Sequence, residues 1–370
     1  MNTPEEIMKF VSAEKNLIWK CLFWKRSYLN KSLEKLQKHE QNALIFLSVD
    51  KPIRLCEILQ RNFYDLQHII NHPKYKQYHI LKKKGGYREI LAPNPVLKKI
   101  QRRLNYFLQA YYLWIKPSEI MGFIINPKYL KTKHSIIENA QMHVGKKYIL
   151  NIDLKDFFKN ISAKRVNALF SSNLFDFNEQ MVTTLTLLTT YNVRLPTGAP
   201  TSPVISNFLC MQMDKDLTAF CIPNSIQYSR YADDLTFSSN QEITPNHMLD
   251  IINRIKKNNF EINERKLRLK RADQKQRVTG LIVNEKVNVD RKLIRKIRAI
   301  IHDITLNGLE TATRRHFNIK EKVDLQDQFN FRNKIEGYIR FIGQVRGKND
   351  PIYTKLLKSF NNSFWILHFP

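Results

Sequence analysis

Three aspartates lie at the ends of short apolar segments that have the character of β-strands. Side chains alternate along residues 147–153, so Asp153, which ends the segment, points to the face opposite Tyr148, Leu150 and Ile152. Farther along, Asp233 and Asp234 occupy a tight turn between two more strand-like segments within residues 226–238. If these strands are neighbours in one sheet, the three carboxylates meet at one of its edges.

Converging carboxylates repel one another and raise one another's pKa, and divalent cations relieve that repulsion. Two Mg²⁺ ions can clamp an in-line phosphoryl displacement, and carboxylate oxygens are the ligands that Mg²⁺ prefers. We therefore predict that Asp153, Asp233 and Asp234 are catalytic residues and bind two Mg²⁺ ions, with Mn²⁺ as a substitute. For the Asp-Asp pair taken alone, the simpler alternative is a polar hairpin turn.

The charge of the chain favours a polyanionic partner. Among its 370 residues, 61 Lys and Arg stand against 33 Asp and Glu, a net charge of +28 at pH 7. A surplus of this size repels itself unless a polyanion neutralises it, so nucleic acid is a better candidate partner than a small acidic metabolite. The alternative is a basic surface that only keeps the protein in solution.

Cysteine spacing and hydropathy exclude several classes of protein. The four cysteines are far apart, which predicts neither a zinc site nor a disulfide framework. No apolar run reaches the roughly 18 to 20 residues that span a bilayer. Glu5 and Glu6, close to the start, argue against a secretory signal. We expect a cytoplasmic protein without a membrane partner.

Basic side chains gather on two predicted elements. Residues 78–91 predict a hairpin that turns at Gly85-Gly86, with Lys82 and Arg88 among its basic side chains. Beyond about residue 286, isoleucines recur at helical spacing behind a capping aspartate. The basic residues off that apolar stripe include Arg291, Arg295 and Arg298. Such a helix is suited to a phosphate backbone, and a charged surface helix is the alternative.

Residues 78–284 resemble, in order, the fingers and palm of reverse transcriptases. The run Asn151-Ile-Asp-Leu-Lys-Asp-Phe-Phe158 is similar to the first palm motif, which in that family supplies a metal-binding aspartate and an aromatic that screens the sugar of the nucleotide. The resemblance makes Phe158 the steric gate, whose ring leaves no room for a 2′-hydroxyl. The alternative is that Phe157 and Phe158 are simply core aromatics.

Three further motifs of the family have counterparts here. Leu195-Pro-Thr-Gly-Ala-Pro resembles the second palm motif, in which Gly198 would line the nucleotide and Thr197 replaces a usual glutamine. Asn263-Glu-Arg-Lys resembles the motif whose lysine lies near the diphosphate, which implies a general-acid role for Lys266. Arg88 stands where the family places a triphosphate clamp, assisted by Lys82 or one of the two lysines after it.

Two short elements resemble those of the bacterial retron branch. They are Asn139-Ala-Gln-Met-His143, ahead of the first palm strand, and Val278-Thr279-Gly280, ahead of the last helices. We predict that these residues bind RNA, together with the three arginines of the basic helix. The alternative for His143 alone is a histidine satisfied within the core.

The resemblance to retron reverse transcriptases implies both a fold and a function. The fold is α+β, a right-hand polymerase: a helical N-terminal extension (residues 1–50), fingers and palm (51–285) and a basic helical thumb (286–370). The function is RNA-directed DNA synthesis from dNTPs. Such an enzyme copies part of a bound structured noncoding RNA into branched, RNA-linked DNA (msDNA), within an antiphage defence system that includes an effector protein.

Two alternatives remain at this point. One is a group II intron-like or other bacterial reverse transcriptase; the tail shows no nuclease or zinc-ligand cluster that would favour it. The other, from a different class, is a catalytically silent RNA-binding scaffold with a polymerase fold. The presence of all three aspartates argues against the scaffold.

Overall fold

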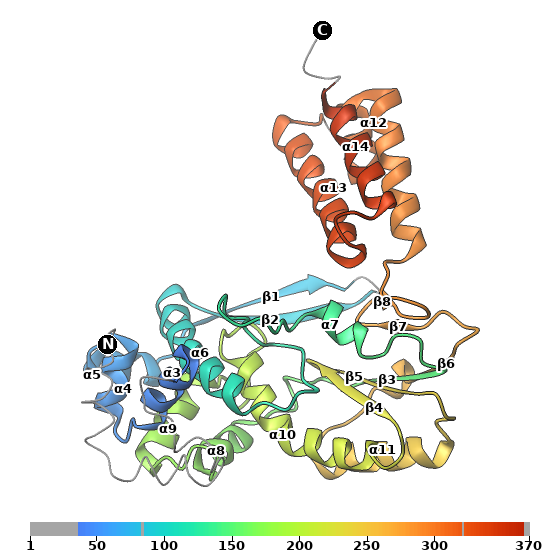
Figure 1. The fold of residues 1–370 in the computed structure, drawn as a ribbon. Helices are drawn as coiled ribbons and strands as arrows, with labels where there is room; N and C mark the ends of the chain where they lie inside the picture. The colour runs from blue at the N-terminus through green and yellow to red at the C-terminus, as the bar shows by residue number, and fades with distance from the viewer. Residues whose placement is uncertain (1–35, 83–84, 320–321, 366–370) are drawn as a thin grey trace. The chain divides into compact units, whose positions relative to one another are not determined.

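A computed structural model describes residues 36–82, 85–319 and 322–365 (Figure 1). The chain forms two compact units. The first comprises Met1–His134, Asn151–Thr236 and Ile243–Leu267, and the second comprises Ser135–Leu150, Phe237–Glu242 and Arg268–Pro370. Residues 1–35, most of the predicted N-terminal extension, lie outside the described residues.

The first unit is rich in helices. They are α3 (Lys38–Leu47), α4 (Pro52–Leu59), α5 (Phe63–Asn71), α6 (Pro95–Ile115), α8 (Ala163–Ser171), α9 (Glu179–Thr189), α10 (Ser202–Cys221) and α11 (Pro245–Lys257). Helix α6 begins where Asn94 accepts a hydrogen bond from the Leu97 amide and Pro95 takes the first helical position. Its apolar stripe is buried, and α6 packs against α3 and α10. Helix α10 also contacts α8 and α11, so it lies at the centre of this unit.

The predicted basic hairpin is present. Strands β1 (Tyr75–Leu81) and β2 (Tyr87–Pro93) pair antiparallel, with Tyr78 opposite Ile90. Both Gly85 and Gly86 have positive φ angles, +87° and +77°, which explains glycine at this turn. The hairpin brings Arg88 and Lys82 to the same end of the two strands.

A four-stranded sheet carries the aspartates. Its order is β4 (Gln227–Tyr231), β5 (Asp234–Ser239), β3 (Tyr148–Asp153) and β6 (Arg268–Arg271). Strands β3 and β5 are neighbours, which confirms that the strand ending at Asp153 lies beside the strand beginning at Asp234. The boundary between the two units falls inside both strands, after Leu150 in β3 and after Thr236 in β5.

The second unit contains three long helices, α12 (Arg291–Phe317), α13 (Leu325–Arg346) and α14 (Pro351–Trp365). It also contains the short helix α7 (Ile136–Gln141) and the strands β7 (Arg277–Val278) and β8 (Leu281–Ile282). Asp290 caps α12 as predicted, by accepting a hydrogen bond from the Lys292 amide. The isoleucine stripe of α12 is buried in one core with α13, α14 and β7.

The combination of many helices with an antiparallel hairpin and a small sheet agrees with the predicted α+β class. Across the described ranges, every helix is too short or too polar to cross a bilayer.

Candidate active site

The backbone at the edge of the sheet fixes the three aspartates relative to one another. The amide of Leu154, next to Asp153, donates to the Asp233 carbonyl at 3.0 Å, which ties the end of β3 to the β4–β5 turn. The amide of Asn263 donates to the Asp153 carbonyl at 2.8 Å. The convergence predicted from the strand ends is therefore built by main-chain hydrogen bonds, independently of the side chains.

The carboxylates destabilise one another's charged forms. Desolvation by the surrounding protein, followed by the charges of Asp233 and Asp153, raises the pKa of Asp234 to about 6. Desolvation also raises the pKa of Asp233, with Asp153 adding to the shift. The positive charges of Lys266 and Arg88 oppose the shift at Asp233. Clustered acids with raised pKa values are typical of a functional site.

Lys266 pairs directly with the first aspartate. It ends a single 3-10 turn (η3, Glu264–Lys266), and its ammonium donates to both Asp153 carboxylate oxygens at 2.8 Å. The lysine is exposed, so the pair contributes little stability. Among the residues that the structure describes, no group of three acidic, histidine or cysteine side chains is placed closely enough to hold a metal ion as it stands.

The chemistry of the donors nevertheless fits a divalent cation. Three carboxylates that repel one another provide hard oxygen ligands and excess negative charge, the two features that Mg²⁺ requires. The lysine ammonium supplies part of the compensating positive charge at Asp153. A cation bound there would share Asp153 with Lys266 or displace it.

The aspartates face a large pocket with a volume of about 1620 Å³. It is lined by the three aspartates, by Lys266, and by the predicted nucleotide-binding side chains Arg88, Lys82 and Phe158. Lys82 and Arg88 are exposed, so both cations are accessible to a ligand. The structure thus brings the predicted metal ligands and most of the predicted nucleotide site into one cavity of the first unit.

Phe158 is half-buried at the wall of this pocket. Its ring lies 5.8 Å from the Phe123 ring and 5.3 Å from the Phe157 ring, measured between centroids. Phe157 is only 5% exposed and stacks on Phe260. One aromatic of the pair therefore belongs to the core, and the other presents a ring that its neighbours hold in place.

The loop containing Thr197 and Gly198 is joined to strand β2. The Thr197 hydroxyl donates to the Glu89 carbonyl at 2.9 Å and accepts from the Leu91 amide at 3.1 Å. The Gly198 amide donates to the Leu91 carbonyl, and a Cβ at Gly198 would lie 2.7 Å from that oxygen. Thr197 lines the pocket, whereas Gly198 is explained by the close approach of β2.

Sequence reasoning missed Glu89, whose carboxylate lies at the pocket wall. It pairs with Lys159 at 3.0 Å and Arg194 at 3.4 Å, and the hydrogen bond from Lys159 is the main cause of its lowered pKa. Glu89 thereby joins the hairpin to two distant segments beside Arg88. Its partners are remote in the sequence, so no local pattern signals the contact.

The two retron-like elements lie together in the second unit. The Thr279 hydroxyl donates to the Ile136 carbonyl at 3.1 Å, which joins the second element to the start of α7. Asn139, His143 and Val278 are fully buried, whereas Thr279 is half-buried and Gly280 is exposed. The structure thus brings the two elements together but leaves only part of them accessible to RNA.

His143 is a buried histidine with a defined partner. Its Nδ1 lies 2.7 Å from the Ser238 hydroxyl, and burial lowers the pKa of His143 to about 3. The ring is therefore neutral at physiological pH. By contrast, Arg291, Arg295 and Arg298 on α12 are all exposed, as the predicted phosphate contacts require.

Comparison with known proteins identifies the family to which the chain belongs. The family model described as "Reverse transcriptase (RNA-dependent DNA polymerase)" matches residues 80–283, which include strand β2 of the hairpin, the four-stranded sheet and all three aspartates. The chain therefore belongs to the reverse transcriptase family. The match confirms the predicted right-hand polymerase class of fold.

Curated relatives define the branch of the family. Retron Mx65 reverse transcriptase of Myxococcus xanthus is 30% identical over 263 residues, covering 66% of this chain and 59% of that protein. Retron Ec86 reverse transcriptase of Escherichia coli is 36% identical over 175 residues, 46% of this chain and 54% of that protein. Retron Ec73 reverse transcriptase of Escherichia coli is 31% identical over 317 residues, 79% of this chain and 89% of that protein.

The chain spans little more than half the length of the first two relatives and most of the third. Within the reverse transcriptases, these similarities place it among the bacterial retron reverse transcriptases, as the two short elements predicted.

Proposed function

We propose that this protein is the RNA-directed DNA polymerase of a retron. It copies part of a bound noncoding RNA into single-stranded DNA that remains joined to the RNA as a branched molecule. The observation that carries the proposal is the pocket in which Asp153, Asp233 and Asp234 face Arg88 and Phe158. Its support comes from the family match and from relatives named as retron reverse transcriptases.

Five side chains of the pocket have proposed tasks in nucleotidyl transfer. The three aspartates would hold two Mg²⁺ ions, which supply activation of the attacking hydroxyl and charge neutralisation at the diphosphate. Arg88 binds the triphosphate through its guanidinium. Lys266 donates to Asp153 in the structure; if its ammonium were released from that pair, it could reach toward the diphosphate and donate a proton to this leaving group.

The RNA is held mainly through its phosphates and its shape. In this proposal the first unit supplies fingers and palm, and α12 to α14 supply the thumb. The exposed α12 arginines contact the RNA backbone, and Thr279 and Gly280 are the accessible part of the retron-like elements. Their buried members, such as Asn139 and His143, support that surface from within.

The proposal extends to the setting implied by kinship. We infer a cytoplasmic complex of the protein with its RNA and msDNA, acting in antiphage defence with an effector protein.

The nature of the bound nucleic acid tests the retron assignment. Purified from cells that also express its neighbouring noncoding RNA, the protein is expected to carry DNA covalently joined to RNA. Ribonuclease treatment should shorten the RNA part of this species without releasing DNA that has a free 5′ end, because in a branched molecule the 5′ end of the DNA is joined to the 2′-oxygen of an internal RNA nucleotide. Gel mobility before and after debranching, followed by sequencing, provides the measurement.

The alternatives give different results in the same experiment. Unbranched, unlinked RNA beside an enzyme that extends primers would indicate another kind of bacterial reverse transcriptase. Bound RNA without any polymerase activity would indicate the silent scaffold. Either outcome contradicts the retron proposal.

Metal binding is expected to depend on pH through the raised carboxyl pKa values. A carboxyl group with a folded-state pKa near 6 is increasingly protonated as the pH falls through 6, and a protonated carboxyl group does not bind Mg²⁺. We expect Mg²⁺ to raise the Tm at pH 7.5 and to raise it much less at pH 5.5. Thermal unfolding with and without Mg²⁺, at matched ionic strength, checks this.

The same carboxyl groups determine how the stability of the metal-free protein changes with pH. Because the pKa of Asp234 is raised to about 6 in the folded state, the free energy of unfolding without metal decreases as the pH rises from the ordinary aspartate range to about 6; the raised pKa of Asp233 acts in the same direction. In the Asp234→Asn variant, the difference between the Mg²⁺-induced rises in Tm at pH 7.5 and pH 5.5 should be much smaller than in the unsubstituted protein, with Asp233 as the remaining carboxyl group of raised pKa. If Mg²⁺ raised the Tm of the unsubstituted protein equally at both pH values, the assignment of these carboxyl groups as metal ligands would be contradicted.

A further inference from the structure

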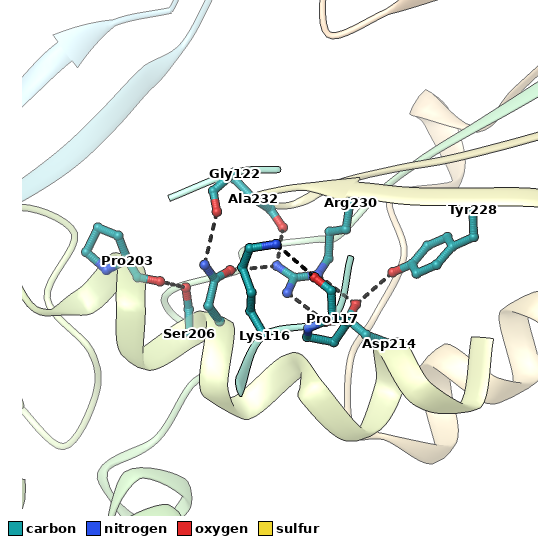
Figure 2. A network of polar contacts seen from close by, with 10 residues as sticks. Lys116, Pro117, Gly122, Pro203, Ser206, Asp214, Tyr228, Arg230 and Ala232 are labelled. Atoms are coloured by element: carbon teal, nitrogen blue, oxygen red, sulfur yellow. Dashed lines mark hydrogen bonds and ion pairs between the residues drawn. The ribbon is translucent and has the colours of Figure 1, made fainter. Parts of the chain in front are cut away.

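The turn that carries Asp233 and Asp234 has a backbone shape that needs support. Ala232 begins this turn with a φ of +61°, a left-handed conformation that is unfavourable for alanine. Such a conformation persists only where surrounding contacts hold it. Figure 2 shows those contacts: a network of polar side chains between β4, α10 and the turn.

Arg230 is at the centre of this network. It precedes the turn by two residues, and its side chain is 0% exposed. Its Nε and Nη2 donate to the two carboxylate oxygens of Asp214, at 2.8 and 2.7 Å. Its Nη1 donates to the Ala232 carbonyl at 3.1 Å (Figure 2). One planar guanidinium thus joins a buried carboxylate to the peptide that leads into the aspartate pair.

Helix α10 provides the fixed side of the contact. Asn207 and Asp214 lie two helical turns apart, so both side chains project from the same face of the helix. The Asn207 amide oxygen accepts from Arg230 Nη1 at 3.0 Å, and its nitrogen donates to the Gly122 carbonyl at 3.0 Å. The hydroxyl of Tyr228 donates to Asp214 at 2.8 Å.

The loop before Phe123 closes the other side of the turn. The Arg230 amide donates to the Glu119 carbonyl at 3.1 Å, and the Met121 amide donates to the Arg230 carbonyl at 3.0 Å. A Cβ at Gly122 would lie 2.3 Å from the Ala232 nitrogen, so only glycine allows this approach. The turn is therefore enclosed by Gly122 and by the guanidinium.

We propose that Arg230 is a positioning residue for the aspartate turn. By holding the Ala232 carbonyl, it sets the directions in which the Asp233 and Asp234 carboxylates point. The inference rests on the proposed polymerase function. A buried ion pair contributes little net stability compared with apolar side chains, whereas it fixes a geometry well, which agrees with a positioning role.

The Arg230→Lys variant tests the role. Lysine keeps a positive charge for Asp214, but a single ammonium on a flexible stem does not reproduce the fork that reaches Ala232 and Asn207. We expect kcat for primer extension to fall about 100-fold, as for an ångström-scale misplacement, with KM for dNTP changed less than about threefold. The Mg²⁺ concentration for half-maximal activity should rise, and so should the Kd for Mn²⁺ measured by electron paramagnetic resonance.

Tyr228→Phe is the matched control. It removes one hydrogen bond from the same Asp214 carboxylate and leaves the contact with Ala232 in place. If Arg230 only stabilised the fold, both variants would lower the Tm and neither would change kcat. The positioning role predicts that kcat and Mn²⁺ binding change only in Arg230→Lys.

A second variant applies if Arg230→Lys does not fold. Asn207→Ala keeps the buried ion pair and removes one of the two groups that orient Nη1, so kcat should fall about tenfold with a parallel weakening of Mn²⁺ binding. A folded variant with unchanged kcat and unchanged Mn²⁺ affinity, beside an active unsubstituted enzyme, overturns the positioning role. Inactivity of the unsubstituted enzyme would instead count against the proposed function.

Discussion

Replacement of Phe158 by alanine is expected to let the enzyme add ribonucleotides. The ring is held at the pocket wall by Phe123 and Phe157, so its removal opens space where the sugar of the incoming nucleotide is expected to lie. A steric clash with the 2′-hydroxyl gives a selectivity for dNTP over rNTP of about two orders of magnitude. The Phe158→Ala variant should lose most of this selectivity. Single-nucleotide incorporation with dNTP and rNTP, compared as ratios of kcat/KM, gives the result.

The neighbouring phenylalanine is the control for this substitution. Phe157→Leu shortens a buried core ring that stacks on Phe260. It should lower the Tm and leave the dNTP to rNTP ratio within about threefold. Equal selectivity in the Phe158→Ala variant and the unsubstituted enzyme would rule out the gate.

Loss of the paired aspartates is expected to abolish DNA synthesis. Substitution of both Asp233 and Asp234 by asparagine keeps the shape of the turn but removes two anionic metal ligands. The loss of several kcal/mol of transition-state stabilisation corresponds to about a thousandfold or more in rate. RNA affinity should change little, because α12 and its arginines lie in the second unit. Primer extension and fluorescence anisotropy with labelled RNA measure the two quantities.

Asp156→Asn separates the role of these ligands from a general effect of charge. Asp156 is an exposed acid that lines the same pocket, and its positive φ of 45° suits asparagine equally well. Activity within about threefold of the unsubstituted enzyme is expected for this variant. Comparable activity in the Asp233, Asp234 double variant would refute the metal-site assignment.

The parts of the site that depend on local pattern were predictable from the sequence. Alternation along residues 147–153 gives the side on which Asp153 lies, and a polar turn between two apolar runs gives the hairpin at Asp233. Asp290 and the isoleucine spacing likewise predict α12. In each case neighbours along the chain determine the structure.

Other features depend on partners that are remote in the sequence. Lys266 was predicted near the diphosphate, and the structure pairs its ammonium with Asp153. The burial of Asn139 and His143 follows from packing within the second unit, which a five-residue motif does not reveal. Arg230 lies two residues before the aspartate turn, yet its role depends on how α10 lies against β4.

Templated DNA synthesis by the unsubstituted protein tests the central claim most directly. With a defined RNA template, an annealed primer, dNTPs and Mg²⁺, we predict extension whose product is complementary to the template and which stops when the metal is chelated. Incorporation that ignores the template sequence, or no incorporation with either Mg²⁺ or Mn²⁺ by a folded protein that binds the primer and template, would contradict an RNA-directed polymerase site at Asp153, Asp233 and Asp234.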